Sequence, residues 1–130
     1  MKQVDIIEEE QPPRRRYDMI VAFNILEHLE RPGKVIEKLS KSLREGGLFM
    51  GSVPFNAGFL GKVHTALTNV FDKTHVSTYS PQRWLALLER AGFRDVQIFG
   101  ETLIGGRETI YLKHRFWRPL WFNMMFSCER

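Results

Sequence analysis

Cysteine and long apolar runs are what this sequence has least of. The 130 residues include a single cysteine, Cys128, which excludes an internal disulfide and fits a reducing compartment such as the cytoplasm. No apolar run approaches the roughly 20 residues that a helix needs to span a bilayer. The acidic start, residues 1–10, lacks the basic-then-apolar pattern of a secretory signal. We therefore expect a cytoplasmic protein without a transmembrane helix.

Internal repeats and low-complexity tracts are also absent, which excludes repeat architectures and a compositionally disordered chain. The composition, with 43% hydrophobic and 12% aromatic residues, can form a packed core. A length of 130 residues suits one domain with a single core, covering residues 1–130.

The charge of the chain is modest and local. The formal net charge is +4, and much of it lies in Arg14–Arg16 and His114–Arg118. Either segment could contact nucleic acid, but no nucleic-acid-binding motif accompanies them, so we expect solvated loops. Trp117 and Trp121 flank Arg118 and could lie at a membrane surface, although packing against a sheet is the simpler interpretation. Nucleic acid and membranes are therefore not the expected partners.

A strand–helix–strand unit is predicted in the first half of the chain. Residues 19–23 are apolar at every position, which is typical of a strand buried on both faces of a parallel sheet. Pro32 suits the first turn of a helix, and Gly46-Gly47 is expected to end it. Residues 48–53 form a second buried strand. The short connections favour a right-handed crossover, so the predicted fold class is α/β with a parallel sheet.

Four further elements are expected in the second half. Phe59–Phe71 is amphipathic; its apolar face is most simply core packing, but it could cover an acceptor or touch a membrane-bound one. Ser80-Pro81 reads as the cap and first turn of a helix that Gly92 closes. Residues 96–99 and 122–128 are expected to be strands. The second of these contains Cys128, for which the sequence shows no activating surroundings.

The order and spacing of these segments resemble one family, the class I S-adenosylmethionine-dependent methyltransferases. Residues 17–29 are similar to the family's fourth strand and the turn after it, and residues 43–48 to the lead into its fifth strand. Residues 52–56 resemble the end of that strand, and residues 75–93 the last helix and its exit. The resemblance implies a partial Rossmann-like sheet, mainly parallel with a reversed last strand, and helices on both faces.

Two features of the family have no counterpart in the sequence: the glycine-rich loop that approaches the cofactor, and the acid at the end of the second strand. Relative to the family, the sequence therefore resembles the C-terminal part only, as a truncated reading frame or half of a split arrangement would. Without the family's first strand beside it, the strand at residues 19–23 would leave a hydrophobic edge unpaired. We expect Val4–Ile7, another copy of the chain in a homodimer, or a complementary N-terminal segment to cover that edge.

The resemblance also implies where the cofactor, S-adenosylmethionine, would bind. Phe23, Asn24 and Leu26 correspond to the end of the family's fourth strand, which lies under the methionine part of the cofactor. Asp5 and Ile6 match the position after the third strand, where an acid meets the adenine amino group. A solvated strand-end carboxylate is the alternative for Asp5. The resemblance does not imply that this chain binds the cofactor alone.

Two histidines are candidate catalytic residues. His28 falls in the turn beside the family's acceptor pocket, and imidazole, with an ordinary pKa of about 6.5, can act as a base near neutral pH. The alternative is a histidine that only hydrogen-bonds to the backbone at the start of a helix. His75 falls where similar proteins fold over the acceptor and could orient a hydroxyl, unless it is an ordinary loop residue. Some relatives bind a metal through Glu-x-x-Glu-His, but Asn24 replaces the first glutamate, so no metal site is predicted.

Two functions from different classes remain open. The first is methyl transfer from S-adenosylmethionine to oxygen or carbon of a small molecule. Asn24 is not followed by the Pro-Pro-aromatic sequence of amino-methylating DNA enzymes, which disfavours nucleobases as acceptors. The second is a non-catalytic remnant or partner subunit that keeps the sheet and does not bind the cofactor alone. An RNA-directed enzyme is a weaker third interpretation, supported only by the basic total.

Overall fold

The computed structural model describes residues 17–55, 63, 66, 76–104, 108–112 and 123–130. Its elements follow the chain in the order β1 (Tyr17–Phe23), η1 (Leu26–His28), α1 (Pro32–Ser42), β2 (Leu43–Pro54), α3 (Pro81–Arg90), β3 (Arg94–Ile104), β4 (Glu108–Leu112) and β5 (Asn123–Glu129). The predicted strands at residues 19–23, 48–53, 96–99 and 122–128 are confirmed, and so are the helices that begin at Pro32 and Pro81. The short strand β4 was not predicted.

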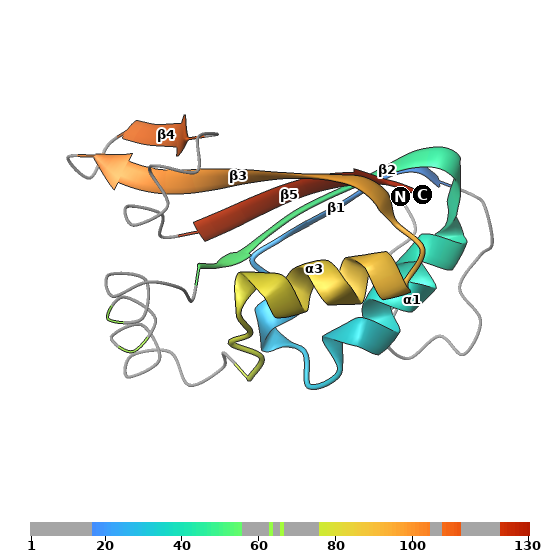
Figure 1. The fold of residues 1–130 in the computed structure, drawn as a ribbon, viewed down its shortest axis with the longest axis horizontal. Helices are drawn as coiled ribbons and strands as arrows, with labels where there is room; N and C mark the ends of the chain where they lie inside the picture. Colours follow the sequence, from blue (N-terminus) through green and yellow to red (C-terminus); the bar gives the residue numbers. More distant parts are fainter. Residues whose placement is uncertain (1–16, 56–62, 64–65, 67–75, 105–107, 113–122) are drawn as a thin grey trace, which may run out of the picture.

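The described strands form one mixed sheet in the order β1-β2-β5-β3-β4 (Figure 1). β1 and β2 are parallel, as the strand–helix–strand unit requires. β5 is antiparallel to both of its neighbours, β2 and β3, so β3 runs in the same direction as β1 and β2. The last strand of the chain is therefore reversed, as the resemblance implied, and it lies inside the sheet between two strands that precede it. β4 is also antiparallel to β3, so three of the four described pairings are antiparallel and the expectation of a mainly parallel sheet was wrong for the described strands.

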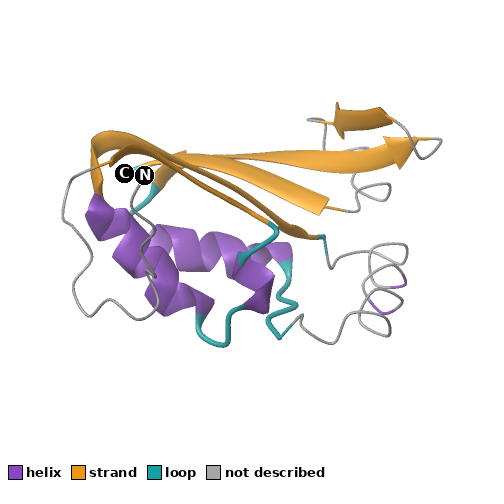
Figure 2. Ribbon diagram, turned by 180° about the vertical axis from the view of Figure 1, so that it is seen from behind, coloured by secondary structure: helices purple, strands orange, loops and turns teal. Residues whose placement is uncertain are grey.

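Both described α-helices lie on the same face of the sheet (Figures 1 and 2). α1 links β1 to β2, and α3 leads into β3, so each returns along the same side of the sheet. The two helices are joined directly, because the Ser40 hydroxyl donates a hydrogen bond to the Ala91 carbonyl at 2.7 Å. The expectation of helices on both faces is therefore not met within the described part of the chain, where only one face carries helices.

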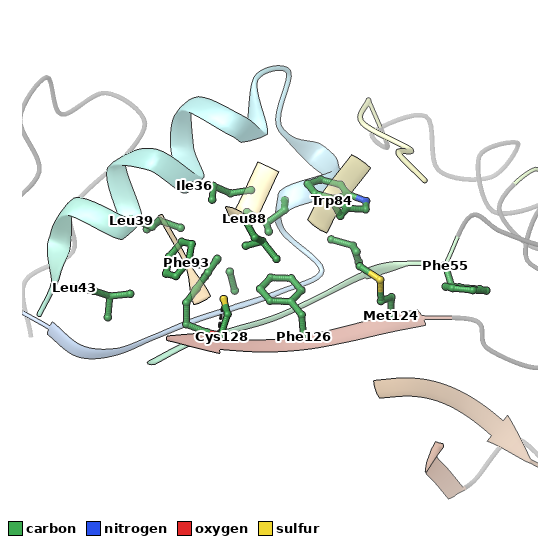
Figure 3. Close-up of a cluster of buried hydrophobic side chains, with 14 residues drawn as sticks. Ile36, Leu39, Leu43, Phe55, Trp84, Leu88, Phe93, Met124, Phe126 and Cys128 are labelled. Carbon is green, nitrogen blue, oxygen red and sulfur yellow. Dashed lines mark hydrogen bonds between the residues drawn. The ribbon is translucent and has the colours of Figure 1, made fainter. Parts of the chain in front are cut away.

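The core fills the space between these helices and the sheet (Figure 3). Ile36 and Leu39 point down from α1, Trp84 and Leu88 from α3, and all four side chains are at most 6% exposed. From the sheet, Phe126 meets Phe49 edge to face, with ring centroids 5.3 Å apart. Apolar burial of this kind is the main stabilising contribution to the fold.

Close packing of the core also explains one glycine in the centre of the sheet. A Cβ atom on Gly51 would lie 2.5 Å from the Phe126 ring and 2.7 Å from the Ala22 carbonyl oxygen. Only glycine therefore leaves room for the Phe126 ring beside β2, and the apolar run of that strand is interrupted there for a steric reason.

The sequence predicted the ends of α3 correctly but misplaced the C-terminal end of α1. Ser80 caps α3, because its hydroxyl accepts a hydrogen bond from the Arg83 backbone N–H, and Gly92 follows with a φ of 89°. α1, however, ends at Ser42, and β2 already begins at Leu43. The prediction that Gly46-Gly47 ends the helix was wrong. Gly46, with a φ of 72°, instead lies within the irregular start of β2, where the register with β1 shifts.

The burial of β1 also differs from the prediction. Ala22 is 6% exposed and faces the helices, whereas Met19, Val21 and Phe23 are 53%, 48% and 43% exposed. Successive side chains of a strand point to opposite faces, so β1 is covered on one face only by the described residues. The prediction of a strand buried on both faces was wrong for this part of the chain, because no described helix lies on the second face.

Several expectations fall on residues outside the described ranges. These are Val4–Ile7, most of Phe59–Phe71, and the tryptophans at 117 and 121. Among the described strands β1 pairs with β2 alone and forms the edge of the sheet. That its outer edge is covered by Val4–Ile7, by another copy or by a complementary segment stays a prediction. In the described part of the chain no helix has the length and apolar character needed to cross a membrane.

Candidate functional site at the carboxyl ends of β1 and β2

The carboxyl ends of β1 and β2 are held together by Asn24 and Ser52. Phe23 lies opposite Ser52 in the parallel register, and the next residue, Asn24, donates its backbone N–H to the Ser52 carbonyl at 3.1 Å. The Ser52 hydroxyl donates to Asn24 Oδ1 at 3.0 Å and lies 3.2 Å from the Asn24 backbone nitrogen. Asn24 has a φ of 50°, a left-handed conformation that asparagine tolerates better than most residues. The polar pair therefore fixes a sharp turn where the two strands end.

This turn presents some side chains and buries others. Phe23 is 43% exposed and Ile25 is 51% exposed, and Asn24 between them is also exposed. Leu26 is 1% exposed and belongs to the core. Of the three residues assigned to the cofactor at this strand end, Phe23 and Asn24 are therefore accessible, whereas the Leu26 side chain supports the turn from beneath.

A second contact fixes the short helix η1 that follows the turn. The Ser77 backbone N–H donates to the Glu27 carbonyl at 2.8 Å, and the Ser77 hydroxyl donates to the Leu29 carbonyl at 2.7 Å. Ser77 is 2% exposed and Glu27 is 1% exposed, so these bonds are shielded from water. The segment that begins at Val76 is thereby attached to both sides of His28, although it is 48 residues distant in sequence.

His28 is half-buried and lines a surface pocket of about 410 Å³ beside the start of α1. Its own backbone N–H is used within the turn, where it donates to the Ile25 carbonyl at 3.1 Å. Leu29 and Val35 supply apolar walls, and the charged lining residues are Glu30, Arg31, Lys34 and Lys38. With three cations against one carboxylate, the pocket has a positive local charge.

A second surface pocket, of about 510 Å³, lies at the opposite end of α1 and is also rich in cations, among them Arg90, Arg94 and Arg130. It is distant in the fold from the strand ends that carry Asn24 and His28, since α1 separates the two pockets. Cys128 lies in neither pocket. It is 1% exposed, and burial raises the pKa of its thiol to about 12, so the described surroundings keep it protonated and unreactive.

The structure brings together only part of the predicted site. Phe23, Asn24, Leu26 and His28 lie in one continuous segment that runs from the end of β1 through η1. Asp5, Ile6 and His75 lie outside the described residues, so their roles stay predictions. Ser52 and Ser77 were not assigned roles from the sequence. Ser52 could have been found, because it is a small polar residue near the end of an apolar strand. Ser77 has no such signal, since only the tertiary fold brings it to the turn.

The fold is the α/β arrangement of S-adenosylmethionine-dependent methyltransferases, as comparison with solved structures shows. The chain superposes on such an enzyme from Thermotoga maritima, described as a possible histamine N-methyltransferase, with a TM-score of 0.76 and 14% identity. The match covers 94% of this chain and 60% of that one. A methyltransferase from Archaeoglobus fulgidus gives a TM-score of 0.74 and 18% identity, with 99% of this chain and 66% of that one covered.

The sequence itself places the chain in a family. A profile of the methyltransferase domain matches residues 1–98, and the chain belongs to that family. The family uses S-adenosylmethionine. Human N-acetylserotonin methyltransferase, solved with this cofactor, matches with a TM-score of 0.56 and 15% identity over 99% of this chain and 33% of its own. No curated protein sequence matches. The chain spans less than two thirds of the first solved relatives, 60% and 66% of their lengths.

The described residues fit one part of the cofactor. The exposed aromatic Phe23 and the polar Asn24 at the end of a parallel strand suit a ligand with an apolar body and charged ends. The Asn24–Ser52 pair holds these groups in place before any ligand arrives, which reduces the cost of binding. Within the described ranges no group of three or more His, Cys, Asp or Glu side chains could hold a metal ion.

Proposed function

We propose that the chain, or a longer domain that contains it, transfers a methyl group from S-adenosylmethionine to oxygen or carbon of a small molecule. The observation that supports the proposal is the turn at Asn24, which follows β1 and is bonded to Ser52 near the carboxyl end of the parallel strand β2. Ligands of open α/β sheets bind at this edge. We place the reaction in the cytoplasm, where a single reduced cysteine is stable.

The chemistry assigned to this chain is mainly positioning. S-adenosylmethionine supplies an electrophilic methyl group attached to a positively charged sulfur. Phe23 and Asn24 would hold its methionine part, and His28 and His75 are the candidates for contact with the acceptor. For a hydroxyl acceptor, the His28 imidazole would take the hydroxyl proton while the oxygen bonds to the methyl carbon and the carbon–sulfur bond breaks, with neutral S-adenosylhomocysteine as the leaving group. Correct alignment of donor and acceptor supplies a large share of the rate enhancement, because transfer needs an in-line approach.

The charge of the pocket beside His28 suggests the kind of acceptor. Arg31 and Lys34 lie on its exposed rim, while Leu29 and Val35 form apolar walls. A small molecule with an apolar body and a carboxylate or phosphate group would be attracted to this pocket. We therefore expect acidic acceptors to be methylated in preference to neutral analogues of the same size.

A second candidate function is a partner subunit that keeps the sheet and does not bind the cofactor alone. The match covers 60% and 66% of the two solved relatives, so a partner that supplies the remaining 40% and 34% of the fold is compatible with it. In this case the chain would bind the cofactor only when a complementary segment is supplied.

Calorimetric titration of the purified chain with S-adenosylhomocysteine separates the two candidates. Saturable micromolar binding is the expected result for an enzyme, and it would exclude the remnant. Absence of binding heat would mean that this chain by itself is not the enzyme and would leave the partner subunit as the better description.

Replacement of His28 by alanine tests the proposed base. For an oxygen acceptor, we expect turnover to fall by about 100-fold or more, while affinity for S-adenosylhomocysteine is unchanged. The fall should be smallest at high pH, where the acceptor loses its proton without help. His114→Ala, which changes a histidine with no assigned role, is the matched control. Unchanged turnover in His28→Ala would remove His28 from the mechanism.

A further inference from the structure

Ser77 is bonded to the backbone on both sides of His28. Its N–H donates to the Glu27 carbonyl at 2.8 Å, and its hydroxyl donates to the Leu29 carbonyl at 2.7 Å. These carbonyls belong to the residues directly before and after His28, and the segment that leads into α3 therefore lies beside η1 (Figure 1). We call this pair of hydrogen bonds the Ser77 clamp.

The short helix η1 has little support of its own. It is a 3-10 helix of three residues, a form whose hydrogen bonds have poorer geometry than those of an α-helix. The backbone bonds donated by His28 and Leu29 within this turn measure 3.1 and 3.3 Å, longer than both bonds of the Ser77 clamp. No described side chain caps its start. The backbone conformation at His28 therefore depends on contacts from outside η1.

Burial strengthens the Ser77 clamp. Ser77 is 2% exposed and Glu27 is 1% exposed, so water has little access to the groups that form it. Hydrogen bonds shielded from water are stronger than exposed ones, and removal of the donor leaves the carbonyl without an easy replacement. The hydroxyl of Ser77 is thus a donor that solvent does not readily substitute.

Ser77 is itself fixed to α3. The Tyr79 N–H donates to the Ser77 carbonyl at 3.0 Å, and the next residue, Ser80, caps the helix. The Tyr79 ring packs on Trp84, which is 2% exposed, with ring centroids 5.2 Å apart. The connection between Ser77 and α3 is therefore short and supported by the core, so that the clamp ties η1 to the packed part of the fold.

We propose that Ser77 is the positioning residue of His28 and that its clamp holds the imidazole in one orientation beside the pocket. Because Ser77 is buried, it acts through His28 and not by contact with donor or acceptor. A base must lie within hydrogen-bond distance of the proton that it takes, and a misplacement of about 1 Å can cost about 100-fold in rate. The inference rests on the proposed function, in which His28 is the base.

Removal of the Ser77 hydroxyl tests the inference with two independent measurements. In Ser77→Ala we expect the nuclear magnetic resonance signals of the His28 imidazole, assigned by their loss in His28→Ala, to move from their natural positions. Turnover should fall by about 10- to 100-fold, while the KM for S-adenosylmethionine is unchanged. Ser77→Thr keeps the donor and should lie closer to the natural chain in both measurements.

Ser40→Ala is the matched control. The Ser40 hydroxyl is also buried, with the residue 4% exposed, and it also donates to a backbone carbonyl at 2.7 Å, that of Ala91. It lies in the C-terminal part of α1, whereas η1 precedes the start of that helix. Its removal should lower the temperature of thermal unfolding about as much as Ser77→Ala does, but the His28 signals and turnover should stay as they are in the natural chain.

Unchanged His28 signals in Ser77→Ala, whatever the turnover, would show that the clamp does not position the imidazole. Equal changes in Ser40→Ala would show that both variants report a general loss of stability, which also contradicts the proposal. If the natural chain has no turnover and Ser77→Ala still moves the His28 signals, the proposed reaction fails and the positioning of His28 is supported.

Hydrogen exchange replaces the variant if Ser77→Ala does not fold, as judged by circular dichroism. In the natural chain the Ser77 amide should exchange as slowly as the paired amides of β2, because its bond to the Glu27 carbonyl is buried. Exchange at the rate of an exposed loop amide would mean that the clamp opens freely and would overturn the proposal.

Discussion

Ala22 and Val21 are neighbours in β1, yet one is 6% exposed and the other 48%. They belong to the two faces of the same sheet. The face of Ala22 is covered by α1 and α3 and contains Phe49, Val53 and Phe126, all at most 2% exposed. The face of Val21 carries residues of the same apolar kind without a described cover. The two faces of β1 therefore carry similar apolar side chains, and they differ in whether the described chain covers them.

The largest expected effect that tests this comparison is the loss of a ring from the covered face. Phe126→Ala should lower the free energy of unfolding by about 3–5 kcal/mol, because it removes a buried ring that packs on Phe49 and Gly51. Met19→Ala, on the other face, should cost less than about 1 kcal/mol when measured at concentrations where the chain is monomeric. Urea titration of both variants measures the difference. Equal costs would mean that the two faces are covered alike.

A smaller effect is the pH dependence of the free energy of unfolding, which tests whether water is excluded from the covered face. Burial raises the pKa of the Cys128 thiol from 9.0 to about 12, whereas the unfolded chain keeps the ordinary value. The unfolded state therefore loses this proton first. The stability contribution is complete below pH 9 and is lost as the pH rises towards 12, by about 1.4 kcal/mol for each pH unit in this window.

The measurement for Cys128 compares urea unfolding of the natural chain with that of Cys128→Ala at pH 8 and pH 10. Lysine and tyrosine titrate in the same range in both proteins, so the difference in slope isolates the thiol. In the folded chain a thiol reagent should also react with Cys128 only as fast as the protein opens. Rapid labelling under native conditions would show that water reaches this face.

The smallest effect on the free energy of unfolding is expected for an ion pair on the surface of the sheet. Arg44 and Asp18 form an ion pair at 2.6 Å, but their side chains are 58% and 77% exposed. Water and salt screen such pairs, so Asp18→Asn should change the free energy of unfolding by less than about 0.5 kcal/mol. Thermal unfolding at low and high salt is a sufficient measurement. A loss as large as that of Phe126→Ala would mean that the edge of β1 is more buried than the described contacts show.

The sequence predicted which helices and strands form better than it predicted where they end and which strands they pair with. Local signals located α3, because Ser80, Pro81 and Gly92 act within a few residues of the helix ends. The end of α1 was misplaced, because the glycine pair at 46 and 47 suggested a helix stop while the tertiary pairing with β1 had already drawn Leu43 into β2. Pairing between strands is a long-range effect that local propensity does not include.

The candidate site shows the same contrast between local signals, which the sequence contains, and long-range contacts, which it does not. Asn24 and His28 were singled out by the resemblance of the segment that follows the first apolar strand, and the structure places both between the end of β1 and the end of η1. The partners that fix this turn, Ser52 and Ser77, are 28 and 48 residues away from the groups they bind. Which distant hydroxyl reaches a given turn is decided by the topology of the sheet and cannot be derived from spacing along the chain.

The position of β5 has a consequence for how the protein is made. β5 holds β2 and β3 together, yet its residues, 123–129, are synthesised after both of them. During translation, β1 and β2 can pair with α1 above them, and β3 can pair with β4, but these two parts of the sheet cannot join until β5 has left the ribosome. The half-sheet that exists before that moment exposes Phe49 and Val53 as well as the face of Val21. The nascent chain is therefore expected to need chaperone protection until β5 has emerged.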